Sequence, residues 1–349
     1  MGTVTATSSD LRAAAFGGSP DAAVRVGRRP LDRWLAAVVL GGRGQYAAAA
    51  TQLARVLADP KAPAAVRAHA AVTRAAHRRQ VGGHAAARRD DALGLRLAST
   101  ATGAKPDAEG TDAWAARVDA LIGLAADAVG LGEGDLAERL LAVAQRAGHG
   151  HPSWRLPVRT GWVRAELALV AGRPAAAVEP AARALENAKA GGSLRHVLKS
   201  RIVLAVARAA ADELDPTAAL AELDAVAADC RRLGLLPLLW PCDMAAADLL
   251  DACSASGTRI DTANDGSSGR AHATPNGAPN DATRRRHAAA ATVSVLYQQN
   301  DPLGRRLMGE SQWLPRQLPV TSLLHTDLRH PHDECHSAQY SRMEGTNPP

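Results

Sequence analysis

The densest group of side chains that could bind a metal lies near the end of the sequence. Six residues of metal-ligand type fall within seven positions: His330, His332, Asp333, Glu334, Cys335 and His336. Imidazole, thiolate and carboxylate groups bind zinc in proteins, and His332 and His336 would share one face of a helix. Pro331 disfavours a preformed site, and the order of residues differs from H-E-x-x-H. Weak, non-specific metal binding by a flexible segment is the simpler hypothesis, so we predict no metal site and no cofactor.

Three glycines, Gly130, Gly132 and Gly134, form a G-x-G-x-G pattern ahead of a helical segment. Backbone N–H groups in such a loop can cradle a phosphate, but a dinucleotide fold needs a β-strand before the glycines. The preceding LIGLAADAV has helical spacing instead, so the pattern predicts a plain turn between two helices.

No other motif predicts catalysis. The sequence has neither a G-x-x-x-x-G-K-[ST] phosphate loop nor a G-x-S-x-G nucleophile motif. We therefore predict that the protein is not an enzyme. An enzymatic function would become the better hypothesis if His149, His151 and a carboxylate such as Glu166 converged in one pocket.

The most basic segment lies between residues 67 and 96. Arg67, Arg74 and Arg78 are spaced to share one helix face. The same segment contains four more arginines and two aspartates, namely Arg79, Arg88, Arg89, Arg96, Asp90 and Asp91. Arginine suits carboxylates and phosphates, so three hypotheses stay open: a solvated face with local ion pairs, a surface for an acidic protein, or a nucleic-acid contact. Aromatic residues that would stack on bases are missing from this segment, which disfavours nucleic acid.

Composition favours helices as the elements that position these groups. Hydrophobic residues make up 46% of the 349 residues, yet the chain has one Phe and three Tyr, and Ala predominates. Ala has the highest helix propensity and packs helices closely, so we predict an all-α protein. The net charge of +6 is mildly basic and permits an acidic partner. The N-terminus has no signal-peptide pattern, and no uninterrupted apolar stretch of roughly 18 residues occurs, so we expect a cytoplasmic protein without membrane contact.

One stretch, from Leu31 to Pro60, has the pattern of a helix–turn–helix unit. Trp34 begins an apolar helix, GGRG makes a turn, and apolar residues at spacings of three and four mark a second helix: Tyr46, Ala49, Leu53 and Val56. Related units follow along the chain. The second unit has Gly82, His84 and Ala87 where the first has Gly44, Tyr46 and Ala49. The third unit has Gly134 and Leu136 in the expected places, but Arg139 where a small residue belongs. The fourth unit has Gly172, Pro174 and Ala177, and a fifth unit begins at about Leu194.

The segment GQYAAA, followed by Leu53, Val56 and Pro60, resembles the tetratricopeptide repeat. Ala- and Arg-rich proteins of this type are common among helical-repeat proteins of high-GC actinobacteria. The resemblance implies antiparallel helix pairs that form an α-solenoid, with a peptide or helix of a partner on its concave face. The first helix of each pair would line that face. Together with the basic residues, this predicts a partner-binding set of Arg67, His69, Thr73, Arg74, Arg78 and Gln80, with Ala76 beside them.

The predicted organisation has three parts. Residues 1–29 form a flexible segment with a short helix after Ser19 and Pro20. Residues 30–253 form a tetratricopeptide-like domain of about five helix pairs, closed by a helix in LLPLLWPCDMAAADLLDAC. Residues 254–349 are predicted to be a largely disordered tail with a short helix at about 287–299. This tail is either a true interaction segment or the product of a frameshift or read-through.

These patterns predict a cytoplasmic scaffold or regulatory binding module for another protein, with acidic partners favoured by the charge. The alternative is a nucleic-acid-associated transcriptional regulator that uses the Arg-rich second unit. Salt dependence would distinguish the two, since phosphate contacts weaken sharply as salt is added.

Overall fold

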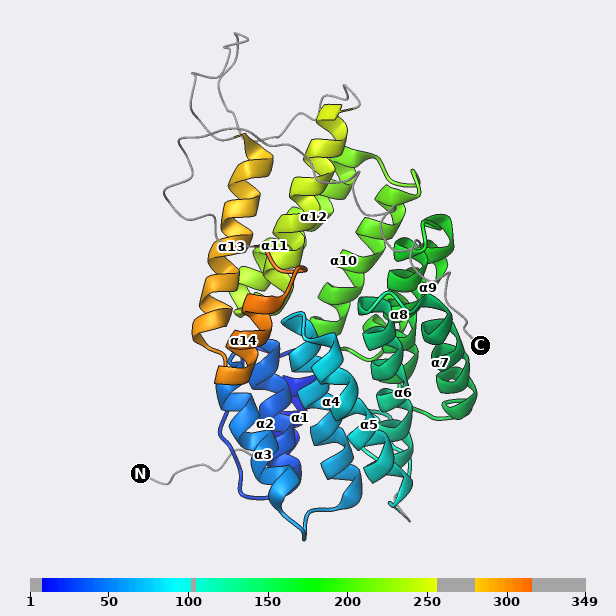
Figure 1. Cartoon of the computed structure of the whole chain (residues 1–349), viewed down its shortest axis with the longest axis vertical. Coiled ribbons are helices and arrows are strands. Elements are labelled where there is room, and N and C mark those ends of the chain that lie inside the picture. Colours follow the sequence, from blue (N-terminus) through cyan, green and yellow to red (C-terminus); the bar gives the residue numbers. More distant parts are fainter. Residues whose placement is uncertain (1–7, 102–104, 256–279, 316–349) are drawn as a thin grey trace, which may run out of the picture. The chain divides into compact units, whose positions relative to one another are not determined.

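The computed structural model describes residues 8–101, 105–255 and 280–315, which all belong to one compact unit (Figure 1). Within these ranges the chain forms helices and no strands, which confirms the all-α prediction. The helices are α1 (Ser8–Phe16), α2 (Pro30–Gly42), α3 (Tyr46–Ala58), α4 (Ala64–Gln80), α5 (His84–Ser99), α6 (Ala113–Gly130), α7 (Gly134–Ala147), α8 (Arg155–Val170), α9 (Ala175–Ala190), α10 (Leu194–Ala210), α11 (Pro216–Leu233), α12 (Leu236–Ala255), α13 (Asp281–Gln298) and α14 (Pro302–Glu310).

From α2 onward the helices pack as consecutive pairs: α2 with α3, α4 with α5, α6 with α7, α8 with α9, α10 with α11, and α12 with α13. The first helices of neighbouring pairs also contact one another, from α2 through α4, α6, α8 and α10 to α12. These first helices therefore form one layer, and the second helices cover it.

A residue in the left-handed backbone region makes the turn inside each of the first five pairs. It is Gly44 (φ +83°), Gly82 (+80°), Gly132 (+74°), Gly172 (+67°) and, in the fifth pair, Asp212 (+56°). Glycine adopts this conformation without the steric cost that a Cβ brings, and it commonly ends helices in this way. The repeated turn sends the chain back along the helix that it has just left.

The third unit is more regular than the sequence suggested. Gly132, and not Gly134, makes the left-handed turn, and Gly134 already begins α7. An alanine with no exposed surface follows each glycine turn at the same spacing: Ala49, Ala87, Ala137 and Ala177. The expectation that Arg139 occupies the small-residue position was therefore wrong by two residues, because either glycine of G-x-G fits the pattern in sequence.

Both ends of the described chain differ from expectation. The short N-terminal helix is α1 and not a helix after Pro20, because Leu11 and Phe16 are buried near Trp34. The closing helix expected near residue 240 exists as α12, but α13 covers it. The short helix expected at about 287–299 is present as α13, which begins earlier, at Asp281, whereas α14 lies where no helix was expected; residues 256–279 and 316–349 lie outside the described residues.

The last two helices connect α12 with the first pairs. Leu296 of α13 and Met308 of α14 share an apolar cluster with Tyr46 of α3 and with Val81. The backbone N–H of Ala47 donates to the carbonyl of Gln299 at 2.9 Å. Figure 1 shows α14, in orange, beside the blue helices α2 and α3. The two ends of the helix array are therefore joined through α13 and α14.

Candidate functional site

The first helices of the six pairs line a pocket of about 500 Å³, which we call the inner pocket. Four residues predicted to lie on the concave face are among its lining residues: His69, Thr73, Ala76 and Gln80, all on α4. The layer of first helices thus forms much of the wall of this partly open pocket.

The three arginines of the predicted partner-binding set lie elsewhere. Arg74 forms an ion pair with Asp90 of α5, with Nη2 and Oδ1 2.6 Å apart. Arg78 pairs with Asp301 across 3.2 Å. Arg67 is half-buried and is not among the residues that line the inner pocket. The basic face of α4 is therefore largely engaged in local ion pairs.

Arg79 does line the inner pocket, but its charge is compensated. Its guanidinium contacts Asp91 and lies 2.8 Å from Asp127, and both carboxylates are fully buried. It also donates to the carbonyl oxygen of Gly123 at 3.1 Å. Burial raises the pKa of Asp91 well above its usual value, and the nearby Asp127 carboxylate raises it further, so Arg79 and the two acids together come close to neutral.

Two rows of cations face the inner pocket from neighbouring helices. Arg155 and Arg159 lie one turn apart on α8, and Arg195 and Lys199 lie one turn apart on α10. The i, i+4 spacing places each pair on one helix face. Because α8 and α10 are first helices of adjacent pairs, the two rows lie side by side in the inner layer.

Arg155 is held rigidly. Its Nη1 donates to the carbonyl oxygens of Glu109 and Gly110, at 2.8 and 3.1 Å, and its Nη2 lies 3.1 Å from Asp119. Only 6% of Arg155 is exposed, and its guanidinium carbon lies 4.4 Å from the ring centroid of Phe16. Its buried Nε has no hydrogen-bond partner among the described residues.

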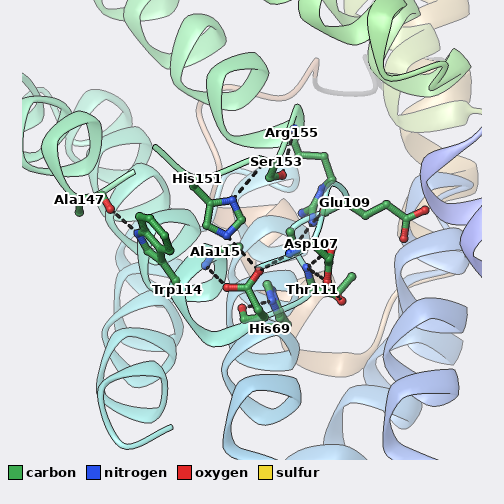
Figure 2. A network of polar contacts seen from close by, with 12 residues as sticks. His69, Asp107, Glu109, Thr111, Trp114, Ala115, Ala147, His151, Ser153 and Arg155 are labelled. Carbon is green, nitrogen blue, oxygen red and sulfur yellow. Dashed lines mark hydrogen bonds and ion pairs between the residues drawn. The ribbon is translucent and has the colours of Figure 1, made fainter. Parts of the chain in front are cut away.

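Figure 2 shows the loop network that surrounds Arg155. The Arg155 backbone N–H donates to Ser153 Oγ, and the Ser153 N–H donates to Nδ1 of His151. Nε2 of His151 therefore carries the proton and donates to Asp112 Oδ2 at 3.0 Å. The carbonyl of Asp112 accepts from Nε2 of His69 at 2.9 Å. The network thus connects α4 to the start of α8 and fixes where Arg155 enters the pocket.

The carboxylates beside the two cation rows leave positive charge uncompensated. Arg155 and Arg159 both bind Asp119, and Lys199 lies 3.5 Å from Glu166. Burial alone would raise the pKa of Asp119, but the two guanidinium groups outweigh it and lower that pKa below its usual value. Four cations therefore face two carboxylates.

Arg195 is the cation without a carboxylate. It forms no hydrogen bond and no ion pair with any described residue. Its side chain lies against Gly42 of α2, whose missing Cβ leaves room for it. Burial and the positive charges of Arg155 and Arg159 lower the Arg195 pKa to about 10. This half-buried guanidinium stays charged at neutral pH and has no carboxylate partner among the described residues.

The wall next to Arg195 is a tryptophan–histidine stack. The rings of Trp162 and His196 lie 5.5 Å apart and nearly parallel, at 16°. Trp162 Nε1 donates to Ser200 Oγ at 2.8 Å, and His196 Nδ1 lies 2.8 Å from Ser193 Oγ. Burial, followed by the charge of Arg195, lowers the His196 pKa well below its usual value. His196 is therefore neutral at physiological pH.

A second stack in the lining of the inner pocket repeats this arrangement. Trp34 and His69 stack at 4.6 Å and 22°, and Trp34 Nε1 donates to Thr73 Oγ1 at 2.8 Å. Burial lowers the His69 pKa to about 4, so this ring is neutral as well. The positive potential of the pocket thus comes from arginine and lysine.

Sequence reasoning missed both the cation rows and the stacks. Each stack follows one pattern: a Trp, then about 35 residues later a His, then a Ser or Thr four positions on. Arg155 and Arg195, like Arg159 and Lys199, differ by one repeat length. A search for polar residues that recur at the repeat period would have found both signals.

The three residues considered for catalysis, His149, His151 and Glu166, do not converge in one pocket. His151 binds Asp112, whereas Glu166 pairs with Lys199 in the inner pocket, and His149 is exposed. The G-x-G-x-G pattern is a turn, as predicted, with Gly132 in the left-handed region. No group of three potential metal ligands occurs within the described ranges, and the cluster at His330 to His336 falls outside them.

Comparison with models of known protein families and with curated proteins finds no match to this chain. None of the helices in the described part of the chain combines the length and the apolar character needed to cross a bilayer.

Proposed function

We propose that this chain is a tetratricopeptide-like binding module that holds an acidic segment of a partner protein in its inner pocket. One observation carries the proposal: Arg195 faces the pocket with no carboxylate partner, beside Arg155 and Arg159, which share Asp119. Enclosed charges are normally paired, and an incoming anion would supply the missing partner.

The size of the inner pocket favours an extended segment over a whole helix. A volume of about 500 Å³ lies within the range of small-ligand sites, whereas a helix with side chains is roughly 10–12 Å across. One or two acidic side chains, or a chain end, fit this volume. Val170 and Trp313, which are 65% and 55% exposed, add apolar surface to the pocket lining for the flanking residues.

The nucleic-acid alternative has less support. Four of the seven arginines in the Arg-rich second unit, on which it depends, pair with carboxylates of the same chain: Arg74, Arg78, Arg79 and Arg88. A phosphate backbone would have to displace these internal partners before it could bind there.

A defined peptide pair tests the proposal. We expect fluorescein-labelled tetraglutamate to bind the full chain, as measured by fluorescence anisotropy, and the matched tetraglutamine peptide not to bind. Arg195→Gln should weaken tetraglutamate binding by about tenfold or more, because a charged hydrogen bond to carboxylate contributes about 1.5–3 kcal/mol. Arg173→Gln is the matched control, since Arg173 is an exposed arginine that pairs with Glu138.

The proposal fails if tetraglutamate does not bind, or if tetraglutamine binds equally well. A labelled DNA duplex in the same assay tests the alternative. Binding of the duplex that Arg195→Gln leaves intact would favour the nucleic-acid function instead.

A further inference from the structure

We propose that the part of the inner pocket between α8 and α10 is a phosphate-monoester site formed by Arg155, Arg159 and Arg195. On this view the acidic segment of the partner carries a phosphorylated side chain. The inference rests on the proposed function, namely that the pocket binds an anion, and it assigns the chemical class of that anion.

The charge at the site matches a dianion better than a carboxylate. Among the residues that line the pocket, the four cations of the two rows face two carboxylates, Asp119 and Glu166, which leaves an excess of two positive charges; Asp107 and Glu109, outside the lining, also attract Arg155. A phosphorylated side chain carries roughly −1.5 to −2 charges at neutral pH, whereas a carboxylate carries one. A single carboxylate would leave one enclosed cation uncompensated, and a phosphate would compensate nearly all of the excess.

The donors that remain free also suit a phosphate. A guanidinium has five N–H donors, and none of those of Arg195 has an acceptor among the described residues. Nη1 of Arg159 contacts Asp119, which leaves its other guanidinium nitrogens for a ligand. Arg155 contributes charge and not hydrogen bonds, because both of its Nη atoms are bound and its Nε is buried. Forked donors of this kind bind phosphate oxygens in pairs, and three phosphate oxygens can use more of them than two carboxylate oxygens can.

The site is built in advance of any ligand. Backbone carbonyls of Glu109 and Gly110 hold Arg155, and Asp119 orients Arg159. Gly42 supports the side chain of Arg195. Arg155 and Arg195 also lie in the first turns of α8 and α10, where the helix macrodipole favours an anion. Little side-chain entropy of Arg155 and Arg159 is lost on binding, because these two groups are already positioned.

The test uses three peptides that differ at one position. Each is an acetylated Glu-Glu-X-Glu-Glu amide, with X as phosphoserine, glutamate or serine, and binding to the full chain is measured by isothermal titration calorimetry. We expect the phosphoserine peptide to bind about tenfold or more tightly than the glutamate peptide, with the serine peptide weakest.

Arg195→Lys separates fork geometry from charge. Lysine keeps the charge but cannot bind a phosphate in a bidentate manner, so we expect the preference for phosphoserine over glutamate to shrink while glutamate binding changes little. Arg173→Lys, on the exposed Arg173–Glu138 pair, should keep the preference unchanged. Circular dichroism and thermal unfolding of each variant show that the fold is intact.

The outcomes distinguish the two proposals. Equal binding of the phosphoserine and glutamate peptides overturns the phosphate assignment and leaves the acidic-segment function standing. Binding of none of the three peptides removes the function itself. Free O-phosphoserine that binds as tightly as the phosphopeptide overturns the assignment to a partner segment, since the flanking residues would then contribute nothing.

Discussion

Single residues of the inner pocket divide into those that provide charge and those that shape the wall. Arg155, Arg159 and Arg195 provide charge, while His69 and His196 stack on tryptophans as neutral rings. A protonated histidine at either stack would add to the repulsion that Arg195 already experiences. Burial is the main cause of the low histidine pKa values, and the positive charge of the neighbouring arginines lowers the His196 pKa further.

An anion in the pocket should therefore change the titration of His196. The His196 pKa is lowered by burial and by Arg195, Arg155 and Arg159, so a bound phosphate that offsets these charges should raise it. We expect the imidazole NMR signals of His196 to titrate at higher pH with saturating phenyl phosphate than with the same concentration of benzyl alcohol. An unchanged titration curve would show that the anion binds elsewhere.

Ser200, which accepts a hydrogen bond from Trp162 of the Trp162–His196 stack, should contribute measurably to stability. Ser200→Ala leaves the buried indole N–H of Trp162 without an acceptor, which we expect to cost about 1–3 kcal/mol of unfolding free energy in urea titrations. Thr73→Ala should have a similar effect on Trp34. Ser254→Ala, at an exposed hydroxyl that bonds within its own helix, is the control, with a change within about 0.5 kcal/mol. Equal values for all three variants would contradict the role of the indole bonds.

At the scale of helices, local sequence was informative where a single residue type decides the geometry. Gly44, Gly82 and Gly172 identify the turns because few other residues adopt a positive φ. Asp212 makes the same turn without a glycine, so its unit has no such signal. The position of α1 depends on burial of Phe16 near Trp34, a contact between elements that local spacing does not encode.

The sequence predicts that α4 lines the inner pocket, but not which charged side chains face it. The repeat pattern placed His69, Thr73 and Gln80 on the inner layer. The Arg74 and Arg78 interactions depend on partners at Asp90 and Asp301, and the latter lies in a part of the sequence that was expected to be disordered. Helical periodicity does not reveal ion pairs between distant segments of the sequence. The sequence pattern therefore favoured the arginine-rich segment over Arg155 and Arg195 as the binding surface.

Close packing between α5 and α6 depends on a glycine. A Cβ at Gly123 would overlap the carboxylate of Asp91, which is fully buried and bound to Arg79. We expect Gly123→Ala to destabilise the chain by about 1–3 kcal/mol in chemical denaturation. Gly309→Ala in α14 is the matched control, because nothing lies within 4 Å of its Cβ position, and it should be neutral or stabilising by up to about 1 kcal/mol. A neutral Gly123→Ala variant would mean that Asp91 is free to move.

At the scale of the whole described unit, α13 and α14 join the end of the helix array to its beginning. Leu296 is only 2% exposed and lies against Gly44, while Asp301 binds Arg78. A linear repeat array has contacts between neighbours only, and its stability is close to a sum of local terms. Here the first two pairs also depend on contacts with residues more than two hundred positions away in the sequence.

This dependence should be visible in hydrogen exchange. Leu296→Ala should cost about 2–5 kcal/mol, as large-to-small changes in a core do, and it should loosen α13 from the first pairs. We therefore expect faster exchange of the Ala47 amide, which donates to Gln299. Val295→Ala, at a residue that is 39% exposed, should leave this amide protected. Global destabilisation with no selective change at Ala47 would argue against direct coupling.

Buried neutral histidines also set the response of the whole unit to acid. The His69 pKa is lowered to about 4 by burial, so the unfolded chain takes up a proton near pH 6.5 while the folded chain does not. The lowered His69 pKa therefore reduces the free energy of unfolding as the pH falls from about 6.5 to about 4, and the total reduction approaches about 3 kcal/mol. His77 and His84, with lowered pKa values of about 3 and about 4, act in the same direction.

The buried Asp91 carboxyl group acts in the opposite sense. The Asp91 pKa is raised by burial, so protonation of Asp91 favours the folded chain as the pH falls. We expect urea midpoints to decrease from pH 6.5 toward pH 4, and to decrease more steeply in Asp91→Asn, which lacks this opposing titration. Midpoints that stay constant over this range would show that the histidines are not buried as neutral rings.

The contacts between α13 and the first pairs have a consequence for biosynthesis. Tyr46 and Val81 emerge from the ribosome long before Leu296 and Met308, which share their apolar cluster. Chain elongation proceeds at roughly 5–20 residues per second, so these side chains stay uncovered for about ten seconds or more. Nascent chains that pause in this interval expose an apolar surface, and they are therefore the form of this protein that we expect chaperones to engage.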